Sequence, residues 1–259
     1  MSKRITSGQI ALVLSVFALL LSGLALWRMD AAREDADFTE KVRAALLAAP
    51  EMLPEAIAVL QSRDEAARKA EQSSRVGAQW ESLRNDPMAP NLGPADAPVT
   101  MIEFYDYQCG FCRRSFPDVM RILAEKKDGI RYIFRQYPVL DGDVGTAGLS
   151  HYAARAAIAA DRQGAFLDFH KTLMTDSARL SKRRILDVAE SLGLDMERFR
   201  KDIDDPAIAG YLADSLALGR HLGIDGTPGY IVNRRILIGA HGYDALMSLI
   251  AAAESDPTD

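Results

Sequence analysis

Cys109 and Cys112, the only two cysteines of the chain, stand in a C-x-x-C spacing. Residues 99–104 before them form a short apolar run rich in β-forming side chains, and residues 111–124 after them carry apolar side chains at a helical period. The pair is therefore expected where a strand ends and a helix begins. Because the free N–H groups and the dipole of a helix N-terminus favour an anion, we expect a lowered pKa for the Cys109 thiol. A thiolate beside a second thiol is suited to thiol–disulfide exchange, in which the second cysteine resolves a mixed disulfide.

Three other roles for the cysteine pair fit the sequence less well. A zinc site needs four ligands, but the chain has no third cysteine and its four histidines are scattered, so no metal is predicted. A structural disulfide that closes so short a loop gains little chain entropy. Two buried, inert thiols are the third alternative. The strand-to-helix context favours redox chemistry, which needs no cofactor because the electrons reside in the dithiol.

The composition is that of a globular protein and gives no reason to expect nucleic-acid binding. Of its 259 residues 48% are hydrophobic and 26% are charged, which is ordinary for a folded domain. The net charge is −5, and no run of basic residues offsets it. The length allows one sizeable domain plus appendages.

The N-terminus carries an apolar run over residues 10–27, preceded by Lys3 and Arg4. This run is longer than the core of a usual signal peptide and approaches the roughly 20 residues that cross a bilayer. We therefore expect residues 1–29 to be a membrane anchor or signal, with an uncleaved single-pass span favoured over a cleaved signal. In both cases the rest of the chain is exported.

Residues 30–86 are rich in Ala, Glu, Lys, Arg and Gln, and favour helix. Asp37 and Glu40 have the spacing of a capping box, and Pro50 is expected to end the helix that they open. The apolar residues of this segment are too few to form a core of their own. Residues 37–83 are therefore predicted to associate with further copies of the chain, the alternative being a solvated stalk.

Residues 87–255 are predicted to form an α/β domain. Its proline-rich beginning indicates a linker that leads into the strand before the cysteines. The periodicity of the remainder predicts a strand, a long helical block, a hairpin of two strands and a closing helix, at residues 130–138, 144–222, 230–232 with 236–238, and 243–253. This order is that of an α/β sheet with a helical insertion.

The cysteine motif, the helical insertion and Gly226-Thr227-Pro228 before the hairpin together resemble thioredoxin-fold oxidoreductases of the DsbA family. Residues 104–112 are most similar to the Com1 and ScsC (suppressor of copper sensitivity) branch, and residues 55–61 match it more weakly. The resemblance implies a thioredoxin fold with a helical insertion over residues 87–255. In some members of this branch an N-terminal helical segment mediates dimer or trimer assembly, which implies a homodimer or homotrimer here.

The resemblance also implies a role for individual residues. Cys109 would attack and Cys112 would resolve. Pro228 would be cis and face the sulfur pair, and Thr227 would present its backbone to an extended substrate segment. Glu103 matches a buried acid that relays protons near the resolving cysteine.

The aromatic residues Tyr107 and Phe111 are expected to be exposed around the motif and to contact unfolded substrate. His151 and His170 are expected to be packing or surface residues.

By this resemblance the chain is a thiol–disulfide oxidoreductase or disulfide isomerase, held in the inner membrane with its catalytic domain in the periplasm, or soluble there after signal cleavage. Its partners would be unfolded or misoxidised envelope proteins and a membrane redox partner. Gly110 and Phe111 between the cysteines, and Thr227 in place of valine, depart from the most oxidising members. They predict a potential nearer about −180 mV than about −120 mV. Two alternatives stay open: a Cu(I)-binding or chaperone-like protein that uses the same dithiol, and a simple monomeric oxidase.

Overall fold

The computed structural model describes residues 20, 22, 24 and 38–255. The predicted anchor at residues 10–27 therefore lies outside the described residues except at those three positions. Within the described part, no single helix is long and apolar enough to cross a membrane. Helix Phe38–Ala48 and helix α2 (Met52–Arg84), bent by 100°, meet the criteria of length and composition only as a pair.

The chain divides into two compact units, Met1–Ala67 and Arg68–Asp259. The first unit contains helix Phe38–Ala48 and the beginning of α2, with Pro50 between the two helices as predicted. Its large apolar side chains are exposed; they include Phe38, Leu47, Leu53, Ile57 and Leu60. This unit therefore has no apolar core of its own within the described residues.

A five-stranded sheet organises the second unit, in the order β1-β3-β2-β4-β5. The central strands β2 (Val99–Tyr105) and β3 (Ile130–Gln136) are parallel, and β4 (Gly229–Val232) pairs antiparallel with β2. Strand β5 (Arg235–Ile238) completes the predicted hairpin, and β1 (Asn91–Leu92) pairs antiparallel with β3. Strand β1 lies inside the stretch that the prolines predicted to be only a linker.

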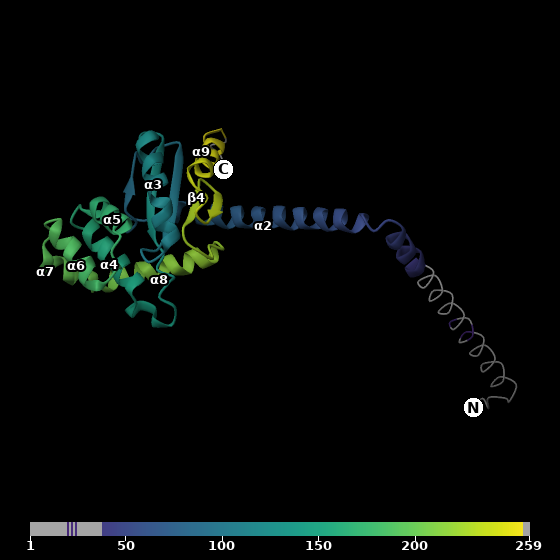
Figure 1. The fold of residues 1–259 in the computed structure, drawn as a ribbon, viewed down its shortest axis with the longest axis horizontal. Helices are drawn as coiled ribbons and strands as arrows, with labels where there is room; N and C mark the ends of the chain where they lie inside the picture. The colour runs from purple at the N-terminus through teal and green to yellow at the C-terminus, as the bar shows by residue number, and fades with distance from the viewer. Residues whose placement is uncertain (1–19, 21, 23, 25–37, 256–259) are drawn as a thin grey trace, which may run out of the picture. The chain divides into compact units, whose positions relative to one another are not determined.

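Alternate residues of β2 face opposite sides of this sheet. Val99, Met101 and Tyr105 join the core beneath α3 (Gly110–Glu125) and α9 (Tyr243–Ser255), which lie beside the sheet in Figure 1. Ile102 and Phe104 join a second core on the other side. Position 103 has the parity of the first group, so Glu103 lies on the face that α3 covers.

The last turns of α2 belong to the second core. Val76 and Leu83 are fully buried with Ile102 and Phe104, whereas the sequence indicated only that residues 30–86 have too few apolar residues for a core of their own. Two buried apolar residues two turns apart are too weak a pattern to detect by periodicity. This half of α2 therefore stabilises the sheet domain.

The helical block is confirmed as a short 3₁₀ helix followed by five α-helices (Figure 1). These elements are η1 (Gly142–Ala147), α4 (Leu149–Asp161), α5 (Phe166–Thr175), α6 (Lys182–Ser191), α7 (Met196–Ile203) and α8 (Pro206–His221). Alanines of α4 are buried at Ala153, Ala156, Ala157 and Ala160, and their small side chains let neighbouring helices pack closely.

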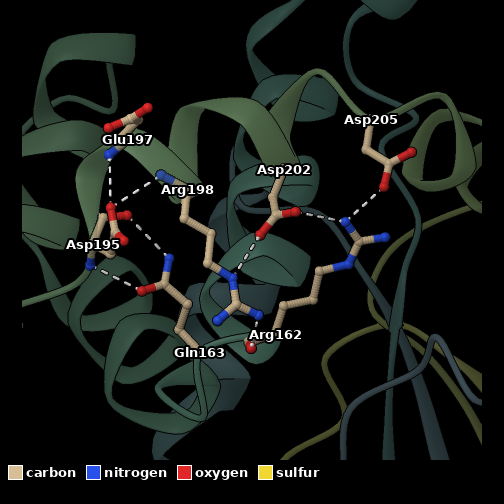
Figure 2. Close-up of polar contacts among 7 residues, drawn as sticks. All are labelled: Arg162, Gln163, Asp195, Glu197, Arg198, Asp202 and Asp205. Atoms are coloured by element: carbon tan, nitrogen blue, oxygen red, sulfur yellow. Dashed lines mark hydrogen bonds and ion pairs between the residues drawn. The ribbon is translucent and has the colours of Figure 1, made fainter.

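A polar cluster fixes the far end of this block (Figure 2). The Arg162 guanidinium lies 2.8 Å from a carboxylate oxygen of Asp202 and 2.7 Å from one of Asp205, which joins the end of α4 to α7 and α8. The Gln163 amide exchanges two hydrogen bonds with the backbone of Asp195, whose carboxylate caps α7. Because Arg162 is balanced by two carboxylates and joins three helices, the role of the cluster is structural.

Candidate active site

Cys109 is the N-cap residue of α3, as the sequence predicts. Its backbone N–H donates to the Asp106 carbonyl at 3.0 Å, and its own carbonyl accepts from Arg113 one turn further on. Both cysteines are free thiols, and their residues are 6% (Cys109) and 1% (Cys112) exposed. The dithiol therefore lies just below the surface, with Cys109 nearer to solvent.

Pro228 faces Cys109 across the site. The Thr227–Pro228 peptide bond is cis, as expected, and the Cys109 sulfur lies 3.2 Å from the Thr227 carbonyl oxygen. This proximity follows from strand pairing, because Gly229 at the start of β4 lies opposite Phe104 near the end of β2. The sheet thus brings together two segments that are far apart in the sequence.

The two thiols have opposite acidities. A hydrogen bond from the Cys112 thiol is the largest cause that lowers the pKa of Cys109, to about 5, with further hydrogen bonds from the Thr227 side chain and from the Cys112 and Phe111 N–H groups. Burial raises the pKa of Cys112 far above its usual range, and the hydrogen bond to Cys109 raises it further. Near neutral pH, Cys109 is therefore a thiolate and Cys112 a thiol.

Glu103 is a buried carboxyl beneath this pair. Burial is the main cause that raises its pKa to about 7, against the lowering effect of hydrogen bonds from Tyr132 and Tyr230. The Tyr132 hydroxyl donates to a Glu103 carboxylate oxygen at 2.5 Å. The negative charges of the Cys109 thiolate and the Glu103 carboxylate also repel each other, which raises the pKa of Glu103 further. Glu103 is therefore close enough to sense the charge of the dithiol. Its acidity suits proton transfer near neutral pH.

The structure separates the two aromatic residues that were expected to contact substrate. Phe111 is 54% exposed in the first turn of α3, with the Arg114 guanidinium 5.0 Å from its ring centroid. The prediction for Tyr107 is wrong, because its side chain is buried and only 1% of the residue is exposed. Tyr107 continues the alternation of Glu103 and Tyr105, which directs it into the core rather than outward.

His170 is a packing residue, as predicted. Its ring is fully buried among aromatic side chains, and its Nδ1 lies 2.9 Å from the Tyr107 hydroxyl. Burial lowers the pKa of His170 to about 3, so the ring is neutral. His151, the other histidine in question, is also buried and bonds through Nδ1 to the Asp141 carboxylate at 2.8 Å.

A polar cluster that the sequence did not reveal holds the loop before Cys109. The buried Asp106 carboxylate accepts from the Gln108 N–H at 2.8 Å, the Ser150 hydroxyl at 2.7 Å and the Leu140 N–H at 3.0 Å. The Gln108 amide in turn donates to Ser150 and Asp141. The sequence feature that could have indicated this cluster is the carboxylate of Asp106, which directly follows strand β2. The cluster fixes the backbone that presents Cys109.

Within the described residues, no group of three or more His, Cys, Asp or Glu side chains is arranged to hold a metal ion.

Comparison with known proteins identifies the family. Residues 83–252 match the family described as thioredoxin, and residues 34–67 match the copper resistance protein ScsC N-terminal domain. Since the first match spans more than half of the chain, this protein belongs to the thioredoxin family. The resemblance to thioredoxin-fold oxidoreductases of the ScsC and DsbA kind is thereby confirmed.

Two solved structures share this fold. A thioredoxin-like oxidoreductase from Silicibacter pomeroyi is 35% identical, with a TM-score of 0.62 over 68% of this chain and 97% of that one. The catalytic domain of Proteus mirabilis ScsC is 27% identical, with a TM-score of 0.61 over 71% of this chain and 99% of that domain. These likenesses support membership of the thioredoxin-like thiol–disulfide exchange family.

The Na(+)/H(+) antiporter NhaA 3 of Salinispora tropica is 34% identical over 161 residues, which cover 62% of this chain and 24% of that protein. The chain therefore spans about a quarter of the length of the curated relatives it matches.

Proposed function

We propose that this chain is a periplasmic thiol–disulfide oxidoreductase that reduces and reshuffles disulfides in envelope proteins. The observation that supports this proposal most strongly is the opposite acidity of the two cysteines: the buried Cys112 thiol donates to a Cys109 thiolate at a helix N-terminus. This arrangement has one sulfur ready to attack and one held back to resolve. The Thr227 carbonyl beside Cys109 supports a docking edge for an extended substrate segment.

In the reductive direction, the Cys109 thiolate attacks one sulfur of a substrate disulfide, and the substrate S–S bond breaks. The first substrate thiolate leaves and takes up a proton, and a mixed disulfide remains. Cys112 then gives its proton to the Glu103 carboxylate and attacks the Cys109 sulfur, which releases the second substrate thiolate. The substrate gains two electrons and the protein loses two; oxidation is the reverse.

The residues around the dithiol favour the isomerase and reductase direction over strong oxidation. Gly110 and Phe111 place no histidine between the cysteines, and Thr227 stands where the most oxidising relatives have valine. Phe111 is exposed at the rim of the site, which suits contact with apolar segments of unfolded substrate.

We further propose that residues 1–29 hold the protein at the inner membrane, that residues 30–86 assemble two or three copies, and that residues 87–255 carry the chemistry. The match to an ScsC N-terminal domain and the exposed side chains of Leu53, Ile57 and Leu60 support assembly. These three residues recur at i, i+4 and i+7 and so share one side of α2.

The experiment that tests the proposed reaction compares two serine variants of the exported chain. Cys109→Ser is expected to abolish insulin reduction, whereas Cys112→Ser retains the attacking sulfur and accumulates mixed disulfides that are visible on non-reducing gels. Insulin reduction by Cys109→Ser at the wild-type rate would refute the proposal.

Assembly has a separate test. Replacing Leu53, Ile57 and Leu60 together by glutamine is expected to yield a monomer by light scattering. This variant should keep insulin reduction and lose activity on scrambled ribonuclease. A monomeric wild-type protein would refute the assembly proposal and leave the reaction standing.

A further inference from the structure

A basic cavity of about 470 Å³ lies between the start of α3 and the loop that joins α5 to α6. Its polar lining comes from Gln108 and Arg113 on one side and from the segment 177–182 on the other, which supplies Arg179, Lys182 and two serines. The cavity has no acidic side chain in its lining.

The cavity is lined by residues that flank the attacking Cys109 in the sequence. Gln108 directly precedes Cys109, and Arg113 follows it by four residues, so Arg113 lies one helical turn away on the same side of α3. The Arg113 N–H donates to the Cys109 carbonyl at 3.1 Å, which fixes this relation. A substrate docked at Cys109 therefore passes the mouth of the cavity within a few residues, since an extended chain advances about 3.3 Å per residue.

Two of the three cations that line the cavity have no carboxylate partner within the described residues. Neither Arg179 nor Lys182 has a carboxylate within ion-pair distance there, and the Lys182 ammonium lies 5.1 Å from the Tyr152 ring centroid. Asp176, the nearest acidic residue in sequence, pairs instead with Arg184 at 2.6 Å. Arg113 donates to the Asp176 carbonyl, and its charge is partly balanced by the Asp176 carboxylate, whose pKa it helps to lower.

Three cations around one cavity contrast with a chain whose net charge is −5. Arg162, by contrast, is paired with both Asp202 and Asp205. A basic cavity with two unpaired cations near a nucleophile selects for an anion that accompanies the reacting group.

We propose that this cavity binds a carboxylate of the molecule that exchanges disulfides with Cys109. The deduction rests on the proposed function and names its preferred substrate: a disulfide whose cysteine is flanked by an acidic group. The carboxylate comes either from a Glu or Asp next to the cysteine of a protein or from a small anionic thiol such as glutathione. Arg179 and Lys182 are the residues that determine this preference.

The test measures stopped-flow rates of the reduced full chain with two disulfide-bonded peptides that differ only in Glu or Gln two residues from the cysteine. Wild type is expected to react about five-fold faster with the Glu peptide at low salt. At low salt an exposed charge pair is little screened, and its stabilisation corresponds to a rate ratio of up to about five. The double variant Arg179→Gln, Lys182→Gln is expected to bring the ratio of the two rates to about one.

Arg183→Glu is the matched control. It changes the net charge by the same amount as the double variant, and its side chain is 91% exposed on α6 outside the cavity. Its rate ratio is expected to equal that of wild type. Glutathione disulfide and its methyl ester form a second pair of substrates, which separates a small thiol from a peptide as the source of the carboxylate.

The outcomes decide between two failures. A wild-type ratio near one for both pairs of substrates, or an equal ratio in wild type and the double variant, overturns the inference while the exchange reaction stands. If no disulfide reacts with Cys109, the proposed function fails and the preference fails with it.

Discussion

The hydrogen bond from Cys112 to Cys109 gives the sharpest test of how this site works. It is the largest cause of the lowered pKa of Cys109, and both sulfurs are buried enough that water is a poor substitute for the donor. Replacing Cys112 by alanine removes the donor. Replacing it by serine keeps an O–H donor in the same place, so Cys112→Ser is the matched control.

The size of the effect follows from the bond. A hydrogen bond to a charged group contributes about 1.5–3 kcal/mol, and one pKa unit corresponds to about 1.4 kcal/mol. Cys112→Ala should therefore raise the titration midpoint of Cys109 by about one to two pH units. With a pKa of about 5, the control is about 90% thiolate at pH 6. The alanine variant should then be between about a tenth and a half ionised.

The assay is the rate of iodoacetamide alkylation of Cys109 between pH 3 and pH 9, in variants where it is the only thiol. We expect a midpoint near pH 5 for Cys112→Ser and a clearly higher one for Cys112→Ala. Equal midpoints would show that the backbone and Thr227 hold the thiolate without Cys112. A midpoint near the ordinary value of a cysteine in both variants would refute the stabilised thiolate itself.

Three further predictions concern the acid, the packing and the potential. Burial raises the pKa of Glu103 from 4.5 to about 7, so the stability it contributes is complete below pH 4.5 and is lost as the pH rises through about 7. Relative to wild type, Glu103→Gln should therefore gain about 3 kcal/mol of unfolding free energy between pH 4.5 and pH 8 in urea titrations, and a constant difference would contradict this. Gly219→Ala places a methyl group 2.3 Å from the Tyr137 ring and should cost about 1–3 kcal/mol in urea unfolding. Gly210→Ala in the same helix meets open space and should be neutral or stabilising; equal losses in the two variants would refute the packing argument. Equilibration with glutathione should give a potential nearer about −180 mV than about −120 mV, and a value at the oxidising end would contradict the reading of Gly110, Phe111 and Thr227.

Several parts of the fold could be predicted because their signals are local. The apolar period after Cys112 predicted α3, the apolar runs at 230–232 and 236–238 predicted the hairpin, and Pro50 predicted the break between the first two helices. In each case a few neighbouring residues fix the backbone through sterics, capping or side-chain period.

Other parts could not be predicted because their partners are distant in sequence. Strand β1 forms only because β3 offers an open edge, and the last turns of α2 are buried only because the sheet exists. The burial of Tyr107 could have been predicted, since this residue continues the alternation of side-chain direction along β2. The Asp106 cluster needed Ser150 and Asp141, which a distant loop and helix provide.

The sequence by itself indicated the chemistry of Cys109, because most of the groups that lower the pKa of this thiol lie within four residues of it. Only the tertiary structure decided what this sulfur faces. The pairing of β4 with β2 brings Thr227 to one side of it, and the packing of the helical block brings Arg179 and Lys182 towards the other. Such encounters depend on strand register and helix packing across more than sixty positions of the chain, which no local pattern of residues encodes.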